Sequence, residues 1–223
     1  MVAVVLSKGK LLLLGFTKLP TLFSMLLSFG VYVQVMGWKF AAGLILSIYI
    51  HEMGHVWELR RFGIKATAPA FIPGFGALIR VKQYPSNPVE DARVGLAGPI
   101  WGTAAALAAY AAFVLSDLPI WGAIARVGAY INLFNLVPVW QLDGSHGMRA
   151  LARPQRWLLL GVVVAACLFT QDFLHVVLAV FVALRAWGGD APERSDRVTL
   201  LQFTSLVVLL TALMSIAVPL GGR

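Results

Sequence analysis

Long, mainly apolar segments, most of them close to the length that crosses a lipid bilayer, restrict the fold of this chain more than any other feature. A helix needs about 20 mainly apolar residues to span the hydrocarbon core. Segments of this kind cover residues 19–36, 38–59, 92–115, 120–137 and 200–219. A shorter pair, 157–170 and 173–187, fits a helical hairpin. The chain is 59% hydrophobic and 13% charged, whereas soluble domains average about 45–50% and about 25%. We therefore predict an all-α polytopic membrane protein with about six to seven transmembrane helices.

The basic residues predict how these helices are oriented. They lie mainly between the apolar segments, and cytoplasmic loops of membrane proteins concentrate lysine and arginine. With a cytoplasmic N-terminus and about seven spans, 15 of the 18 basic residues fall on the cytoplasmic side, and the others are Lys39, Arg126 and Arg223. We expect a multi-pass protein of the cell membrane. The net charge of +8 would also suit nucleic acid, but this distribution favours the lipid bilayer as partner and argues against nucleic acid.

The segment from 64 to 84 is not predicted to be helical. Two prolines and two glycines interrupt it, and Pro73-Gly74 is a typical turn. Its flanks, 64–72 and 75–82, fit two short strands. Because these flanks are too apolar for a fully solvated loop, we predict a small membrane-associated β-hairpin after the second helix. A surface loop with an apolar underside is the alternative.

A metal-binding pattern, His51-Glu52-Met53-Gly54-His55, lies inside the second apolar segment. Residues four apart share one face of a helix, so His51 and His55 can bind the same metal ion. Glu52 follows the first histidine, where a general base is needed. Ionisable groups at membrane depth indicate function. We predict zinc, one ion per chain, because catalytic zinc takes three ligands from histidine and carboxylate and keeps one position for water.

The third ligand must come from elsewhere in the chain. His51 lies nine residues before Arg60, which is about 13 Å along a helix. Asp143 lies six residues before Arg149 and therefore at a similar depth. Only Asp143 and His146 lie at this depth and also follow a predicted interruption of a helix. The chemistry of aspartate and histidine does not decide which of the two is the third ligand. An aspartate before a glycine is also a common turn or helix N-cap.

Three motifs together resemble the site-2 protease family of intramembrane zinc metalloproteases. They are His51-Glu52-x-x-His55, Gly98-Pro99 and Asn135-x-x-Pro138-x-x-x-Leu142-Asp143-Gly144. The resemblance covers about residues 15–187. It implies that Asp143 is the third zinc ligand, that Glu52 is the general base and that Asn135 helps to hold the oxyanion.

The resemblance also implies a function and a substrate class. The expected reaction is hydrolysis of peptide bonds within or near transmembrane segments by zinc-activated water, as in regulated intramembrane proteolysis. The expected substrate is a single-span membrane protein. From the Pro-Gly turn and the apolar flanks of the hairpin, rather than from the resemblance, we expect the unwound substrate segment to join the hairpin as an added strand. Candidate substrate-binding residues in the hairpin are Gly74, Phe75, Gly76, Ala77 and Leu78. Gly98 and Pro99 are further candidates, although close helix packing is the simpler explanation for them.

We predict three parts in the chain. These are an intramembrane metalloprotease core at 1–187, a polar cytoplasmic linker at 188–199 and a further transmembrane helix within 200–223, without the PDZ or CBS domains that other relatives carry. The alternatives are a membrane metal transporter or sensor and an inactive scaffold. A transporter needs acidic or histidine residues through both leaflets, which are scarce here, and the intact Glu52 argues against a scaffold.

Overall fold

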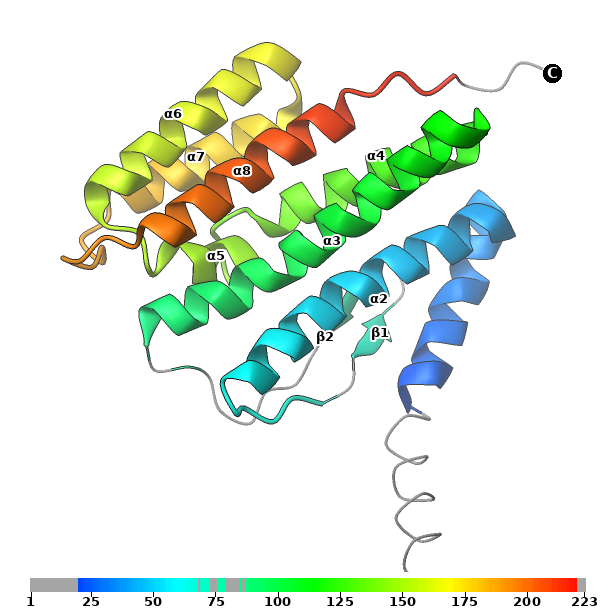
Figure 1. The fold of residues 1–223 in the computed structure, drawn as a ribbon, viewed down its shortest axis with the longest axis horizontal. Helices are drawn as coiled ribbons and strands as arrows, with labels where there is room; N and C mark the ends of the chain where they lie inside the picture. The colour runs from blue at the N-terminus through cyan, green and yellow to red at the C-terminus, as the bar shows by residue number, and fades with distance from the viewer. Residues whose placement is uncertain (1–19, 68, 73–75, 79–84, 86, 220–223) are drawn as a thin grey trace, which may run out of the picture.

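Helices that run alternately in opposite directions make up most of the protein (Figure 1). The structure is a computed structural model and describes residues 20–67, 69–72, 76–78, 85 and 87–219. A first helix covers Pro20–Met36. The helices that follow are α2 (Trp38–Arg61), α3 (Pro88–Ser116), α4 (Pro119–Asn135), α5 (Asp143–Met148), α6 (Arg153–Thr170), α7 (Phe173–Trp187) and α8 (Arg197–Met214).

Local signals in the sequence explain where several helices begin and end. The side chain of Asn87 caps the first turn of α3, as asparagine commonly does. Gln171 ends α6 in the left-handed conformation, with φ of 52°. Asp172 then begins α7 by accepting a hydrogen bond from the N–H of Leu174 at 2.8 Å. The turn between α6 and α7 therefore lies where the sequence predicted it.

Charged side chains tie the helices together at one end of the molecule. There α2 and α7 end, and α3, α6 and α8 begin (Figure 1). Arg156 Nη1 lies 2.7 Å from Asp190 Oδ1, and Arg185 Nη2 lies 2.8 Å from Asp190 Oδ2. Burial opposes ionisation of Asp190, but the hydrogen bond from Arg156 and the charges of Arg156 and Arg185 hold its pKa below the usual value. The carboxylate thus stays charged, and its ion pairs persist, down to lower pH than for a free aspartate.

A short β-hairpin follows α2. Its strands, β1 (Ala70–Ile72) and β2 (Gly76–Leu78), are antiparallel, with Phe71 opposite Ala77. The N–H of Phe71 donates to Ser24 Oγ of the first helix at 3.0 Å. The buried Phe71 side chain clusters with three α2 side chains, Leu44, Ile45 and Ile48. The described strands are shorter than the predicted flanks, and association of this hairpin with a membrane stays a prediction.

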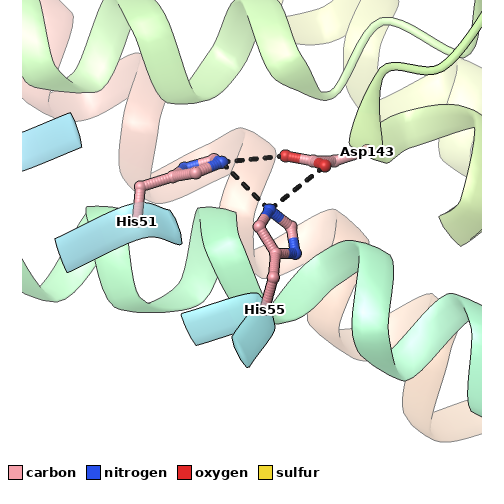
Figure 2. A group of neighbouring side chains, drawn as sticks. All are labelled: His51, His55 and Asp143. Atoms are coloured by element: carbon pink, nitrogen blue, oxygen red, sulfur yellow. Dashed lines mark hydrogen bonds and ion pairs between the residues drawn. The ribbon is translucent and has the colours of Figure 1, made fainter. Parts of the chain in front are cut away.

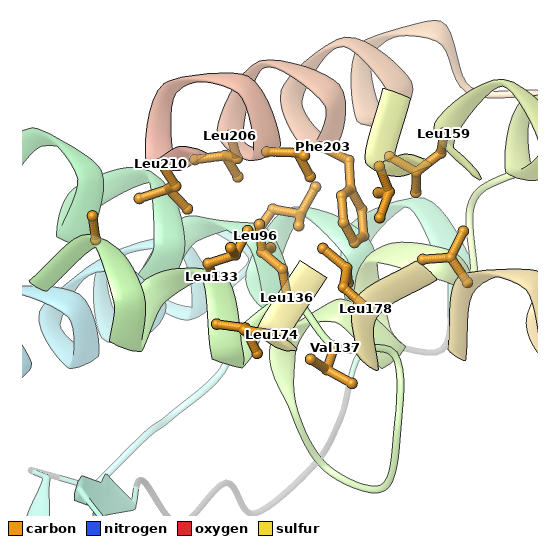
Figure 3. Close-up of a cluster of buried hydrophobic side chains, with 14 of the residues drawn as sticks. Leu96, Leu133, Leu136, Val137, Leu159, Leu174, Leu178, Phe203, Leu206 and Leu210 are labelled. Carbon is orange, nitrogen blue, oxygen red and sulfur yellow. The ribbon is translucent and has the colours of Figure 1, made fainter. Parts of the chain in front are cut away.

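The main hydrophobic core lies between α3, α4, α6, α7 and α8 (Figure 3). Its fully buried side chains include Leu96, Leu133, Leu159, Leu178 and Phe203. Because α8 contributes to this cluster, it packs into the same unit as α3 to α7. The last helix was predicted at 200–219, whereas α8 covers Arg197–Met214, starting at the capping residue Asp196. The predicted division of the chain at residue 187 stays a prediction.

Two of the described helices, α3 and α8, are long and apolar enough to cross a membrane by length and composition. The first helix and α7 are apolar but shorter. Polar and charged residues interrupt the apolar character of α2, namely His51, Glu52, His55, Glu58, Arg60 and Arg61. The predicted number of transmembrane helices therefore stays a prediction.

Candidate metal centre

Three potential metal ligands converge between α2 and the start of α5 (Figure 2). The Nε2 atoms of His51 and His55 lie 3.2 Å apart. Asp143 Oδ2 lies 3.1 Å from His51 Nε2, and Asp143 Oδ1 lies 3.3 Å from His55 Nε2. Within the described residues these three side chains form a group whose ligand atoms all lie within 4.8 Å of one another. The structure therefore joins the two predicted histidines to Asp143, eighty-eight residues beyond His55 in the chain.

The second nitrogen of each ring fixes which tautomer the histidine adopts. His51 Nδ1 lies 2.8 Å from Asn132 Oδ1, and the Asn132 amide donates through Nδ2 to the Gly128 carbonyl at 2.7 Å. His55 Nδ1 lies 2.8 Å from the Val94 carbonyl. Both partners are acceptors, so each neutral ring carries its proton on Nδ1 and presents a lone pair at Nε2.

These lone pairs make the site suited to a cation. Two Nε2 lone pairs and a carboxylate meet at one point, which is unfavourable unless a positive charge lies between them. Asp143 Oδ2 is buried and accepts no well-aligned hydrogen bond, although His51 Nε2 is near enough for an ion pair. Two histidines and a carboxylate, with each imidazole Nδ1–H donating to a second partner, are characteristic of divalent metal sites. The residues thus fit the predicted metal ion.

His146, the other candidate for the third ligand, has a different partner. Its Nδ1 lies 3.0 Å from both carboxylate oxygens of Asp91 on α3. The group that could hold a metal ion contains Asp143 and not His146. The geometry of the described residues therefore favours Asp143 over His146, and the role of Asp143 as the third ligand stays a prediction.

Glu52 and Asn135 are the two predicted catalytic residues. Glu52 is 8% exposed and interacts electrostatically with His51, His55 and Asp143. Asn135 is half-buried at the end of α4, and Asn132, almost one turn earlier, is the amide that contacts His51. Sequence reasoning missed Asn132, although a second amide three residues before Asn135, in a mainly apolar helix, was a usable signal. The catalytic roles of Glu52 and Asn135 stay predictions.

Glycines on α3 let this helix approach the metal ligands. A Cβ on Gly98 would overlap His55 Nε2 and lie 2.7 Å from His51 Nε2. A Cβ on Gly102 would overlap the side-chain amide of Asn132. Gly98 therefore packs directly against both rings, as the packing explanation expects, and Pro99 is buried beside it. Contact of Gly98 or Pro99 with a substrate stays a prediction.

The candidate substrate-binding residues of the hairpin are only partly described. Gly74 and Phe75 lie outside the described residues. Gly76, Ala77 and Leu78 form β2. Their contact with a substrate stays a prediction.

Comparisons with known proteins find similarity to metalloproteases. The model of peptidase family M50 matches residues 39–118, which carry His51, His55 and Gly98 but not Asp143. A zinc metalloprotease of Methanocaldococcus jannaschii is 23% identical over 128 residues, which are 55% of this chain and 37% of that protein. The chain thus spans little more than a third of the length of this relative. The solved site-2 protease of the same organism is 17% identical, with a TM-score of 0.44, over 80% of this chain and 91% of that chain.

Proposed function

We propose that this chain, which belongs to the site-2 protease family, is a zinc metalloprotease that hydrolyses peptide bonds within or near transmembrane segments of other membrane proteins. The observation that carries this proposal is the convergence of His51, His55 and Asp143 beside the buried Glu52. This set provides a metal site with a base next to it, which is the minimum that metal-assisted hydrolysis requires.

Each residue of the centre has a distinct part in the proposed reaction. His51, His55 and Asp143 would hold the zinc ion, which supplies a Lewis acid for the scissile carbonyl and acidifies water. Glu52 would accept the proton of the attacking water on its carboxylate and deliver it to the leaving amine. The amide of Asn135 would donate to the oxyanion of the tetrahedral intermediate. Asn132 and the Val94 carbonyl would keep both histidine rings in the tautomer that leaves Nε2 free to coordinate.

The surface of the helices supports a membrane location for this reaction. Large apolar side chains are widely exposed on the helices, for example Phe23, Leu115, Leu168, Phe169 and Phe173, each at least 72% exposed. Apolar surface on this scale is typical of contact with lipid rather than with water. Arginines lie where α2 and α7 end and where α3, α6 and α8 begin. These helix ends are at one end of the molecule (Figure 1), which favours that end as the cytoplasmic one. The metal ligand His51 would then lie about 13 Å from that end of α2, which keeps the path for water short.

The hairpin offers a place for an unwound substrate segment. The N–H of Phe71 donates to Ser24 and not to β2, so Phe71 and Ala77 form a non-hydrogen-bonded pair. The N–H and carbonyl of Ala77 therefore point away from β1. A transmembrane helix must lose its internal hydrogen bonds before it is cut, and this outward edge would replace them as in β-strand addition.

Replacing Ala77 with proline is expected to lower cleavage of a helical membrane substrate, because proline removes the outward N–H while β1–β2 pairing is kept. Cleavage of a short unstructured peptide should change less, since such a peptide needs less help to unfold. Both rates are measured with purified protein in lipid vesicles. Ala77→Val, which keeps the N–H, is the control. Equal rates for Ala77→Pro and Ala77→Val on the helical substrate would end the strand-addition proposal.

Removal of the metal tests the proposed function as a whole. We expect a strong chelator to abolish cleavage of a single-span substrate in vesicles, and stoichiometric zinc to restore it, because the divalent ion would polarise the scissile carbonyl and acidify the attacking water. Zinc content is measured on the same samples. Full cleavage by protein shown to be free of metal would contradict the proposal.

A further inference from the structure

The short helix α5 begins with Asp143, the proposed third metal ligand. The position of this ligand therefore depends on what holds α5 in place. The helix contains only 6 residues, and isolated helices of this length are not stable. Its position relative to α2, which carries the other two ligands, must therefore be set by its neighbours. Helix α3 packs against α5 and can provide this support.

A buried carboxylate on α3 holds α5 from one side. Asp91, in the first turn of α3, has a side chain that is only 2% exposed. Both of its oxygens lie 3.0 Å from His146 Nδ1, and Oδ2 lies 2.8 Å from Arg149 Nη1. His146 belongs to α5, and Arg149 caps its end. The Asp91 carboxylate thus contacts one side chain of α5 and the side chain of the residue that caps its end.

The same face of α3 also contacts the histidine half of the centre. One turn beyond Asp91, a Cβ on Gly95 would lie 2.5 Å from His146 Cβ and 3.0 Å from the Asp143 carbonyl oxygen. The Val94 carbonyl binds His55 Nδ1, and Gly98 packs against both rings. Helix α3 therefore touches both halves of the metal site, through Asp91 and Gly95 on one side and Val94 and Gly98 on the other.

A second support holds the far end of α5. Arg156 is completely buried and donates to the carbonyls of Met148 and Leu151 at 3.1 and 3.0 Å. It fixes the segment that follows α5 to α6. Among the described residues its hydrogen bonds go to the last residue of α5 and the segment after it, to the end of α7 and to Asp190, and none reaches α2 or α3. Arg156 is therefore not expected to set the distance from Asp143 to the histidines.

We propose that Asp91 is a positioning residue of the metal site. It binds α5 through His146 and Arg149, and so holds Asp143 in register with His51 and His55. The inference rests on the proposed metal-binding function, which it deepens by assigning a residue that none of the sequence motifs contains. Replacing a residue that hydrogen-bonds directly to a metal ligand typically changes metal affinity by about 10- to 100-fold. Asp91 acts one contact further out, so we expect the lower end of this range.

The test compares Asp91→Asn with a matched variant, Arg93→Gln. Arg93 lies two residues along α3 and pairs with Asp196 at 2.9 Å, which ties α3 to α8 without touching α5. Zinc release from the purified full chain is followed with an excess of chelator. Visible absorption after replacement of zinc by Co²⁺ reports the ligand geometry, and thermal unfolding of each variant reports general stability.

We expect Asp91→Asn to release zinc about 10-fold faster or more and to shift the Co²⁺ absorption. Arg93→Gln should lower Tm but release zinc at the wild-type rate. His146→Ala removes the other half of the contact at a site that is 19% exposed, so it serves even if Asp91→Asn does not fold. The double variant should release zinc no faster than Asp91→Asn alone, because His146 acts through a contact that Asp91→Asn already weakens.

Two results would overturn this inference and leave the proposed function intact. One is wild-type zinc release and wild-type Co²⁺ absorption in both Asp91→Asn and His146→Ala. The other is an equal acceleration in Arg93→Gln, which would show that any loss of stability loosens the metal. Absence of zinc binding in the unaltered chain would instead overturn the proposed function, and this inference with it.

Discussion

Replacing Glu52 with glutamine should leave zinc bound and lower the rate of substrate cleavage by about 10²- to 10⁴-fold, the usual contribution of a general acid–base residue. Glutamine has nearly the same shape as glutamate but does not take up the proton of the attacking water. Glu52 is not among the three residues that converge on the metal position, so the ligands remain. The measurements are zinc content and initial rates with a single-span substrate in vesicles.

Glu58→Gln is the control for this change. Glu58 is a second buried acid of α2, 7% exposed, and it pairs with Arg61 rather than with the metal ligands. It should keep both zinc and activity. Cleavage that survives Glu52→Gln would remove Glu52 from the mechanism, whereas loss of zinc in that variant would give Glu52 a role in binding the metal.

Replacing Gly98 with alanine is expected to weaken zinc binding by about 100-fold, the upper end of the range for residues that orient metal ligands. The added methyl group would overlap His55 Nε2 and lie 2.7 Å from His51 Nε2. Either the rings rotate away or α3 separates from α2, and both changes disturb the ligand geometry. Affinity is measured by competition with a chelator of known strength.

Gly161→Ala on α6 is the matched control, because a Cβ there has no heavy atom within 4 Å. It should bind zinc as tightly as the unaltered chain. Wild-type affinity in Gly98→Ala would mean that the close approach of α3 to the histidine rings is not required for metal binding, and the packing account of Gly98-Pro99 would have to be given up.

The helices were largely predictable because their signals are local. Apolar segments bounded by proline, aspartate and glycine indicated α3, α4, α6 and α7 within a few residues. The end of α8 was less accurate, since the apolar run continues past Met214 to Pro219 while the helix does not. The cap at Asp196 was visible in the sequence, and it places the start of α8 better than the apolar pattern does.

The metal centre was predictable in part for a different reason. His51 and His55 share one helix face, so their spacing alone pairs them. Asp143 followed only from its depth and from the resemblance to a family. Asn132 and Asp91 could not be found in this way, because their roles depend on how α4 and α3 pack against α2 and α5. Which residues of neighbouring helices face each other depends on the whole bundle rather than on any one segment.

X-ray absorption at the zinc edge of the purified, unaltered chain tests the central claim most directly, since it counts the atoms around the metal. A site made by His51, His55 and Asp143 predicts two imidazole ligands, with oxygen in the remaining positions. A third imidazole would point to His146 and contradict the assignment of Asp143. A spectrum without imidazole ligands would contradict the metal site itself.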